Sequence, residues 1–321
     1  MSARVGVVII THRARHLLPR CIPPLAASPL RPRILVVNSD SRDGTVECAR
    51  ALGAETWVVP RPSFNHGLTR EAARRRLGGD IVVMMTPDVR PISPHFLERL
   101  IAPVAAGGAA VAYARQLPRP EACALERLGR SFAYPPRSEL RSREDYARLG
   151  SATHFCSNAC AAWSQPALDA VGGFPETLVS EETITAARLL RAGFRIAYVA
   201  GAEVVHSHPV SLLADFRRQF DIGWTRARFA PLLLAAGSDE ARGFVYLRRL
   251  LRGLAREAPA ALPYALLHTA LRYAGYRLGR LAHNWPPALC ALFSGQEYYW
   301  APRARELRAS ASAERRCASS L

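Results

Sequence analysis

The sequence contains no lysine, and all 43 of its basic residues are arginines. Against 26 acidic residues this gives a formal net charge of +17 at pH 7. An all-arginine composition is also what a GC-rich genome produces, so it does not by itself indicate specific recognition. The excess positive charge indicates an anionic partner: a membrane surface, a phosphorylated substrate or a nucleic acid.

Cysteine is scarce and irregularly spaced, and the seven residues form no CxxC pair. This argues against a zinc ribbon and against a disulfide framework, and favours buried, reduced thiols in a cytoplasmic protein. Cys156 and Cys160 are therefore interpreted as core residues. No run of about 18 uncharged apolar residues occurs, so we expect no membrane-spanning helix. The first strand begins at residue 5, so we expect no signal peptide.

The common nucleotide-binding fingerprints are also missing. The first strand is followed by THRARHLLPR, which contains neither GxGxxG nor GxxxxGK[ST]. NAD binding of the usual Rossmann type and P-loop chemistry are both disfavoured. Because no RNP-like or helix-turn-helix signal accompanies the charge, we expect no nucleic-acid partner.

Buried strands alternate with helices in the first half of the chain. VGVVII, at residues 5–10, is a β-branched run of the kind that is buried on both faces in a parallel sheet. Further strands are expected near residues 34–37, 54–60, 80–85 and 110–114, with helices at about 14–26, 46–52 and 68–77. This order predicts an α/β fold with an open, mostly parallel sheet, in which ligands bind at the carboxyl ends of the strands.

Polar residues follow several of these strands. Thr86-Pro87-Asp88 ends the fourth, and Asn65 or His66 can cap the helix after the third. The stretch from the fifth strand to about residue 149 is basic, broken by proline and expected to be irregular. Long loops of this kind are often lids or binding loops.

Glu181 and Glu182 open an amphipathic helix whose apolar face contains Ile184, Ala187 and Leu190, and which Gly193 ends. Two interpretations fit these carboxylates: they interact with the helix dipole, or they serve a catalytic site. The HSH sequence at residues 206–208 follows the next strand and favours a site.

The character of the sequence changes at about residue 211. Apolar faces bordered by Arg, Trp and Tyr suit helices that lie in a membrane interface, and they equally suit helices packed on a catalytic domain; both can hold at once. We therefore divide the chain into a catalytic domain (1–210), an amphipathic helical region (211–303) and a disordered tail (304–321).

Taken together, VVIITHR, ILVVNSDSRDGT, SFNHGLTR, TPDV, YARQLP, CSNACAAW, GGFPE, EE, AGFRIAYV, HSH and RRQFDIG resemble the bacterial rhamnosyltransferases. These are inverting family 2 glycosyltransferases with the GT-A fold. The resemblance runs in order from residue 5 to about residue 300. It implies a Rossmann-like catalytic domain, a nucleotide-sugar donor (dTDP-L-rhamnose), a divalent cation (Mg²⁺ or Mn²⁺) and a lipid-linked or glycan acceptor. It also implies cell-envelope polysaccharide synthesis, such as that of O-antigen, by a cytoplasmic enzyme peripheral on the inner face of the cell membrane.

The resemblance also implies roles for individual residues. Asp88 takes the place of the metal-binding DxD motif, with His206 or His208, of which we favour His206, as a second ligand. Glu182 takes the place of the catalytic base beside Glu181, where the family has Glu-Asp. The donor-binding residues are expected to be Thr11, Asn38, Asp40, Asn65, His66, Arg70, Thr86 and Asp88, and Arg115 and Gln116 are expected on the acceptor side.

Asn38 stands where the family has an aspartate that contacts the nucleotide base. This departure leaves open a donor with another sugar. Together with the Glu182 substitution, it also leaves open a catalytically weak relative that binds nucleotide-sugar without turnover. Metal-dependent sugar transfer separates that relative from an active enzyme.

Overall fold

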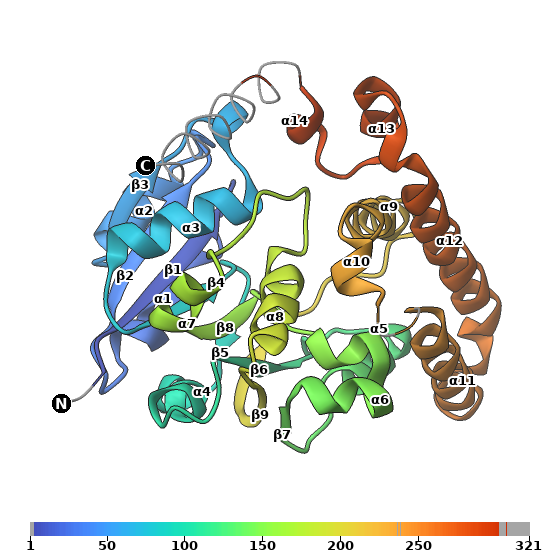
Figure 1. Cartoon of the computed structure of the whole chain (residues 1–321), viewed down its shortest axis with the longest axis horizontal. Helices are drawn as coiled ribbons and strands as arrows, with labels where there is room; N and C mark the ends of the chain where they lie inside the picture. Colours follow the sequence, from blue (N-terminus) through green and yellow to red (C-terminus); the bar gives the residue numbers. More distant parts are fainter. Residues whose placement is uncertain (1–2, 236, 238, 302–305, 307–321) are drawn as a thin grey trace.

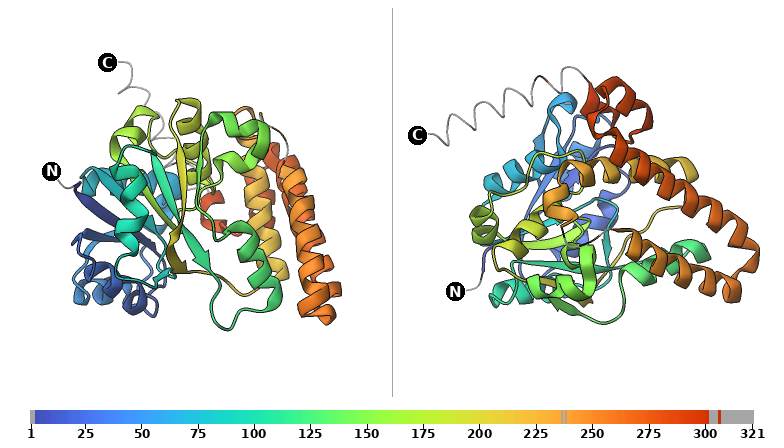
Figure 2. Two further views of the ribbon diagram at one scale, coloured as in Figure 1. Left: turned by 90° about the horizontal axis from the view of Figure 1, so that it is seen from below. Right: turned by 45° about the vertical axis from the view of Figure 1, so that its right-hand side comes forward.

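The computed structural model describes residues 3–235, 237, 239–301 and 306. A single twisted sheet forms the centre of the molecule, and the helices after residue 211 stand to one side of it (Figures 1 and 2). One apolar core lies on each face of the sheet. The first strand is buried from residue 6 to its end, as its β-branched sequence predicts.

The sheet has nine strands in the order β3-β2-β1-β4-β8-β6-β9-β5, with β7 paired to β9. The strands β1 to β4 run parallel, as predicted, whereas β8 lies antiparallel between β4 and β6. The sheet is therefore mixed: β6 and β9 also pair in parallel, but β5, β7 and β8 pair antiparallel with their neighbours, so the expectation of a mostly parallel sheet holds fully only for β1 to β4. The bounds are β1 Val5–Thr11, β2 Arg33–Asn38, β3 Glu55–Val58, β4 Ile81–Met85, β5 Arg90–Pro91, β6 Val111–Leu117, β7 Glu139–Arg141, β8 Cys160–Ser164 and β9 Ile196–Val205.

Helices cover both faces of the sheet. Side chains of α1 and α4 fill the core on one face, and those of α3, α7 and α8 fill the core on the other. The predicted helices are confirmed with small shifts at their ends. The bounds are α1 Leu18–Ala26, α2 Thr45–Ala51, α3 His66–Leu77, α4 Phe96–Ala105, α5 Ala124–Ala133, α6 Tyr146–Leu149, α7 Gln165–Ala170 and α8 Glu181–Arg191, with short 3₁₀ turns η1 Arg61–Ser63 and η3 Gly150–His154.

The stretch expected to be irregular up to residue 149 is largely regular, so that prediction was wrong. The strand β6 continues to Leu117, and α5, β7 and α6 follow it. The reason is long-range packing, because Leu125 and Leu128 of α5 contact Leu250 and Leu254 about 125 residues later in the chain. The local proline and arginine pattern does not reveal that contact.

The helices after residue 211 close the structure on one side. Phe220 and Trp224 of α9 pack with Leu178 and Trp300 in a separate apolar cluster. A Cβ atom at Gly223 would collide with the carbonyl oxygen of Tyr276, so glycine allows α9 and α12 to touch. The bounds are α9 Leu212–Arg228, α10 Ala230–Leu233, α11 Asp239–Glu257, α12 Leu262–Leu281, α13 Pro287–Phe293 and α14 Glu297–Trp300.

Across the described part of the chain, no helix has the length and apolar composition needed to cross a membrane. Cys156 and Cys160 are buried and unbridged, which confirms their interpretation as core residues. The tail expected to be disordered at 304–321 lies outside the described residues, except for Glu306.

Candidate active site

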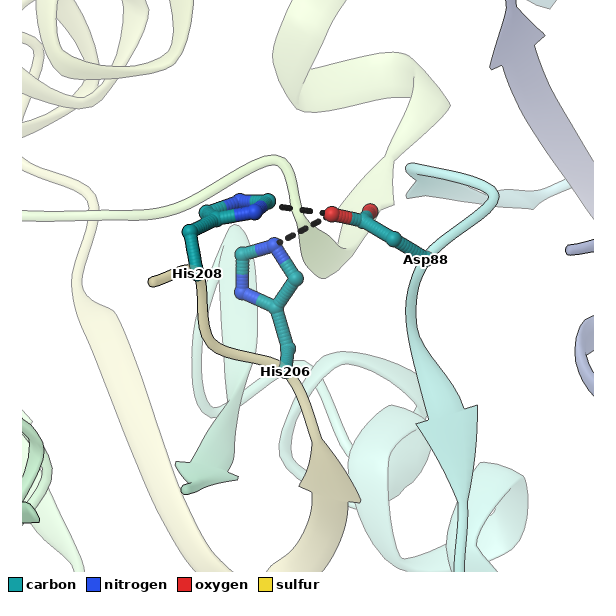
Figure 3. A group of neighbouring side chains, drawn as sticks. All are labelled: Asp88, His206 and His208. Carbon is teal, nitrogen blue, oxygen red and sulfur yellow. Dashed lines mark ion pairs between the residues drawn. The ribbon is translucent and has the colours of Figure 1, made fainter. Parts of the chain in front are cut away.

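Three side chains converge beyond the ends of β4 and β9. Asp88 Oδ2 lies 3.3 Å from His206 Nε2 and 3.3 Å from His208 Nε2 (Figure 3). The sequence left open which histidine accompanies Asp88, and the structure brings both to it. His206 is nearly buried, whereas the side chain of His208 is 42% exposed.

The strand pairing explains this convergence. The short strand β5 runs antiparallel to β9 and pairs Arg90 with Val205, so the turn before β5 lies beside the end of β9. The backbone N–H of His206 donates to the carbonyl oxygen of Leu117 at 3.0 Å, which continues the β6–β9 ladder by one residue. Asp88 and His206, 118 positions apart, are thus fixed by backbone hydrogen bonds.

The donor set of this cluster suits a divalent cation. One ligand atom from each of Asp88, His206 and His208 lies within 4.8 Å of the other two. Asp88 Oδ1 and Thr86 Oγ1 are buried; the Thr86 side chain interacts with the Asp88 carboxylate, but neither atom makes a hydrogen bond of normal geometry with a described residue. A buried carboxylate oxygen without a partner is costly, and a bound cation offsets that cost.

The electrostatics agree with this assignment. Burial opposes the ionisation of Asp88, but the hydrogen bond and charge of His206 hold the pKa of that carboxyl well below its usual range. Partial burial and the neighbouring His206 lower the pKa of His208 to about 4. At neutral pH the cluster therefore offers an ionised carboxylate together with the neutral imidazole of His208, and both are competent ligands.

The acidic pair lies at the start of α8, directly after Ser180. Ser180 is a non-glycine residue with a left-handed backbone, φ +65°. Such strained residues cluster at functional sites. Glu181 turns into the protein, where its Oε1 lies 3.1 Å from Arg70 Nη1 and accepts a 3.0 Å hydrogen bond from Asn158 Nδ2. Burial opposes ionisation, but the charge of Arg70 keeps the pKa of Glu181 below its ordinary value.

Glu182 is in the opposite situation. It forms no ion pair and no side-chain hydrogen bond with another described residue, and it keeps part of its surface accessible. The surrounding protein desolvates its carboxylate and Glu181 repels it, and together they raise the pKa of Glu182 to about 8. A carboxylate with a pKa near the working pH is suited to accept a proton from a hydroxyl group.

A network of hydrogen-bonded side chains extends from the Asp88 cluster toward the acidic pair. The charge of Glu182 acts on the buried Tyr134, whose hydroxyl is hydrogen-bonded to Ser157. Ser157 Oγ accepts a 2.9 Å hydrogen bond from Gln116 Nε2, and Gln116 Oε1 lies 2.7 Å from His206 Nδ1. Glu182 therefore acts electrostatically on a residue that is linked through hydrogen bonds to His206.

The residues expected to bind the donor base lie where predicted, at the carboxyl ends of β1 and β2. The Asn38 amide is 1% exposed and is engaged inside its own turn, where it donates to Thr11 Oγ1 and accepts from the Ser41 N–H. Asp40 is exposed and pairs with Arg42 across 3.6 Å. Both Asp40 and Arg42 have positive φ angles, so this loop is held in an unusual backbone conformation.

Asn65, His66 and Arg70 join α3 to distant segments. Asn65 is the helix cap: its Oδ1 accepts from two N–H groups of the first turn, and its Nδ2 donates to the Thr177 carbonyl at 3.0 Å. His66 Nε2 lies 3.4 Å from Gln296 Oε1. Gly67 lets α3 approach the loop before α8, because a Cβ there would collide with a backbone carbonyl. Arg70 pairs with Glu181 directly, and Asn65 and Gly67 hold α3 against the loop that precedes the acidic pair.

The two residues expected on the acceptor side differ in their surroundings. Arg115 pairs with Glu203 at 2.7 Å and is partly exposed. Gln116 is 1% exposed, and it contacts the Nδ1 side of the His206 ring, away from Asp88. Both belong to β6, not to the loop after it.

Sequence reasoning missed several residues of this site. Asn158, which holds Glu181, lies within the CSNACAAW stretch and could have been found there. Arg130 donates to Gln116 Oε1 at 2.6 Å, and nothing in the sequence distinguishes it from the other arginines. Arg61 donates to Ser39 Oγ and stacks 4.0 Å from the ring of Tyr298, a residue too distant in sequence to be anticipated.

Comparisons with known proteins identify the family of the chain. The profile of the family described as Glycosyl transferase family 2 matches residues 6–172. The chain is 31% identical to the O-antigen chain rhamnosyltransferase RfbN of Salmonella typhimurium over 309 residues, which cover 92% of this chain and 96% of that protein. It is 33% identical to the O-antigen chain rhamnosyltransferase WbaN of Salmonella anatum over 270 residues, covering 84% and 86%. These matches confirm the resemblance inferred from the motifs.

Among solved structures, the chain is similar to a mannosyltransferase from Pyrobaculum calidifontis that was solved with GDP-mannose and Mn²⁺. The TM-score is 0.61 at 18% sequence identity, and the match covers 89% of this chain and 88% of that one. At this identity the match establishes a shared fold, which confirms the predicted GT-A class.

Proposed function

The chain belongs to glycosyl transferase family 2, and we propose that it transfers L-rhamnose from dTDP-L-rhamnose to a lipid-linked or glycan acceptor in O-antigen-type polysaccharide synthesis. The sugar and the pathway rest on the two Salmonella rhamnosyltransferases. The observation that carries the reaction type is the contrast between the two glutamates: Glu181 is neutralised by Arg70, whereas Glu182 forms no ion pair with any residue that the structure describes.

Glu182 acts as the general base in a single displacement. Its carboxylate accepts the proton of an acceptor hydroxyl, and the hydroxyl oxygen forms a bond to the anomeric carbon of the donor sugar. The bond from that carbon to the diphosphate oxygen breaks on the opposite face, and the nucleoside diphosphate leaves with the electron pair. The anomeric configuration inverts, so a β-linked donor gives an α-linked product.

Asp88, His206 and His208 would hold a divalent cation. Two imidazoles beside one carboxylate favour Mn²⁺ over Mg²⁺, because Mg²⁺ prefers oxygen ligands. When bound, the cation supplies positive charge that stabilises the leaving diphosphate. We assign these groups and the acidic pair to a catalytic domain of residues 1–210, and residues 211–303 to a helical region that carries a docking surface.

That surface is the outer face of α11 and α12, and we propose that it binds the anionic inner face of the cell membrane. On α12 the exposed positions Leu266, Ala270 and Tyr273 follow one another at helical spacing. On α11 the exposed Phe244 is followed at four-residue intervals by the exposed residues Arg248, Arg252 and Arg256. An apolar stripe bordered by arginines has the pattern of a helix pair in the interface of an anionic bilayer.

Sedimentation with phosphatidylglycerol vesicles tests this surface. The wild-type protein is expected to bind them at low salt and to bind phosphatidylcholine vesicles less well. The double variant Phe244→Ser/Leu266→Ser is expected to lose binding, whereas Ile92→Ser, which changes an exposed apolar residue in the loop after β5, keeps it. Equal binding by wild type and the double variant would refute the assignment of this face.

Calorimetric titration with dTDP, UDP, GDP and their sugars, with and without Mn²⁺, tests the donor. We expect cation-dependent binding with a preference for dTDP-L-rhamnose. Tighter binding of another nucleotide-sugar would keep the reaction and replace the substrate. If folded protein binds none of them, the enzyme assignment is wrong.

A further inference from the structure

The Gln116 side chain is buried at the end of β6, and all three of its hydrogen bonds go to other side chains. Its Oε1 lies 2.6 Å from Arg130 Nη1 and 2.7 Å from His206 Nδ1, and its Nε2 lies 2.9 Å from Ser157 Oγ. The molecule offers a direct comparison in Gln165, a buried glutamine whose Nε2 donates to the backbone carbonyls of Arg74 and Gly78. Gln165 thus bonds to backbone as well as accepting from Arg74 Nη1, whereas the side-chain hydrogen bonds of Gln116 to described residues all go to side chains of the candidate site.

The partners of Gln116 determine how its amide is oriented. Arginine donates hydrogen bonds and never accepts them, so the amide atom that faces Arg130 must be the oxygen. The same oxygen faces His206 Nδ1, so that nitrogen must carry a hydrogen. In the neutral imidazole that binds a cation, the lone pair then lies on Nε2, the atom that faces Asp88 Oδ2 at 3.3 Å; when no cation is bound, Nε2 carries a hydrogen that Asp88 accepts.

We propose that Gln116 is a positioning residue that fixes His206 in the Nδ1–H tautomer and so presents Nε2 to a divalent cation, with Arg130 holding the amide from its other side. This inference rests on the proposed cation site of Asp88, His206 and His208. A ligating histidine commonly donates its second N–H to a fixed acceptor, and that acceptor sets both the tautomer and the ring orientation.

Arg130 extends this arrangement to another element. It projects from α5, and the Gln116 oxygen is its one side-chain hydrogen-bond acceptor among the described residues. The packing of α5 against α11 therefore fixes the position of Arg130 and, through Gln116, the orientation of the His206 ring. In consequence, loss of the Arg130 guanidinium weakens cation binding although Arg130 touches no ligand atom of the cluster.

Mn²⁺ titration followed by electron paramagnetic resonance, without nucleotide, tests the proposal. Gln116→Leu is expected to weaken Mn²⁺ binding by about 10–100-fold, the usual effect of losing such a partner. Gln116→Glu, which still accepts from both donors, is expected to retain it. Gln165→Leu is the matched control: it removes a buried glutamine of structural role and is expected to leave Mn²⁺ affinity unchanged.

The outcomes separate this inference from the proposed function. If the wild-type protein binds Mn²⁺ and Gln116→Leu binds it equally well, the role of Gln116 is refuted and the cation site stands. If the wild-type protein binds no Mn²⁺, the cation site itself is refuted. A second readout requires no metal: the ¹⁵N spectrum of His206 should show protonated Nδ1 in the wild type and mixed tautomers in Gln116→Leu. A single Nε2–H tautomer in the wild type would overturn the proposal.

Discussion

Arg70 Nη1 lies 3.1 Å from Glu181 Oε1, and both side chains are at most 5% exposed. This buried pair separates the functions of two adjacent carboxylates. Glu181 is held ionised and immobile by Arg70 and Asn158, while the side chain of Glu182, the next residue, has no hydrogen-bond or ion-pair partner in the described part of the chain. The negative charge of Glu181 in turn helps to keep Glu182 ready to take up a proton.

Glu181→Gln is expected to destabilise the protein. Removing one partner of a buried ion pair leaves an uncompensated charge and costs about 3–5 kcal/mol in the free energy of unfolding. Urea unfolding measures this loss. The control is Glu55→Gln, which breaks the exposed pair with Arg33 and should cost less than about 1 kcal/mol. Equal effects of the two substitutions would contradict the anchoring role of Glu181.

The stability contributed by Glu181 depends on pH in a defined direction. Its pKa is lower in the folded protein than in the unfolded chain, where it is about 4.3. The stabilisation is therefore fully present above that value and is lost as the pH falls through the folded-state pKa. Unfolding of the wild type and Glu181→Gln between pH 7 and pH 3 should show the difference between them shrinking toward acid.

Glu182→Gln is expected to abolish most turnover without loss of stability. Loss of a general base lowers the rate by about 10²–10⁴-fold. Because the folded-state pKa of Glu182 is raised to about 8, its ionised form destabilises the fold as the pH rises above about 4.3. The glutamine variant should thus be at least as stable as the wild type at pH 8. A variant that is both inactive and destabilised would indicate a structural role.

The pH dependence of kcat/KM is expected to reveal the pKa of Glu182. Since Glu182 must be deprotonated to accept a proton, kcat/KM should rise with pH and reach half its maximum near pH 8, the pKa of this side chain. Steady-state rates from pH 6 to pH 9.5 measure this. A profile that is flat between pH 6 and pH 9 would exclude Glu182 as the base.

Removal of the cation, or of a residue that holds it, should stop transfer. Chelation with EDTA is expected to abolish activity, and added Mn²⁺ to restore it. Asp88→Asn and His206→Ala should each lower kcat by about 10²–10³-fold, as expected for the loss of a preorganised electrostatic group. His95→Ala serves as the control, because His95 pairs with Glu98 at the surface. Full activity in EDTA would contradict a cation-dependent mechanism.

Much of this arrangement could be predicted because strand ends are readable from sequence. Asp88 and His206 each follow a recognisable buried strand, and the rule that ligands bind at the carboxyl ends of strands brings them together. Likewise, Glu181 and Glu182 stand out at the start of a periodic helix. The resemblance assigns the base to Glu182, but the sequence does not show what distinguishes it from Glu181, since that difference depends on Arg70 and Asn158, which contact only Glu181.

Other features depend on packing between distant segments. The helix α5 was missed because its apolar residues find their partners on α11. Gln116 was expected to follow the fifth strand, but it lies within β6, which continues past a register shift between Ala114 and Arg115 to Leu117. Pairing of that kind depends on β9, some 90 residues later, and has no local signal.

The most direct test of the central claim is the stereochemistry of the product. The protein would be incubated with dTDP-β-L-rhamnose, Mn²⁺ and synthetic sugar–diphosphate–lipid acceptors, and the new linkage assigned by NMR. We predict an α-linked rhamnoside from the wild-type protein and little or none from Glu182→Gln. A β-linked product, or equal turnover by Glu182→Gln, would contradict an inverting displacement in which Glu182 is the base.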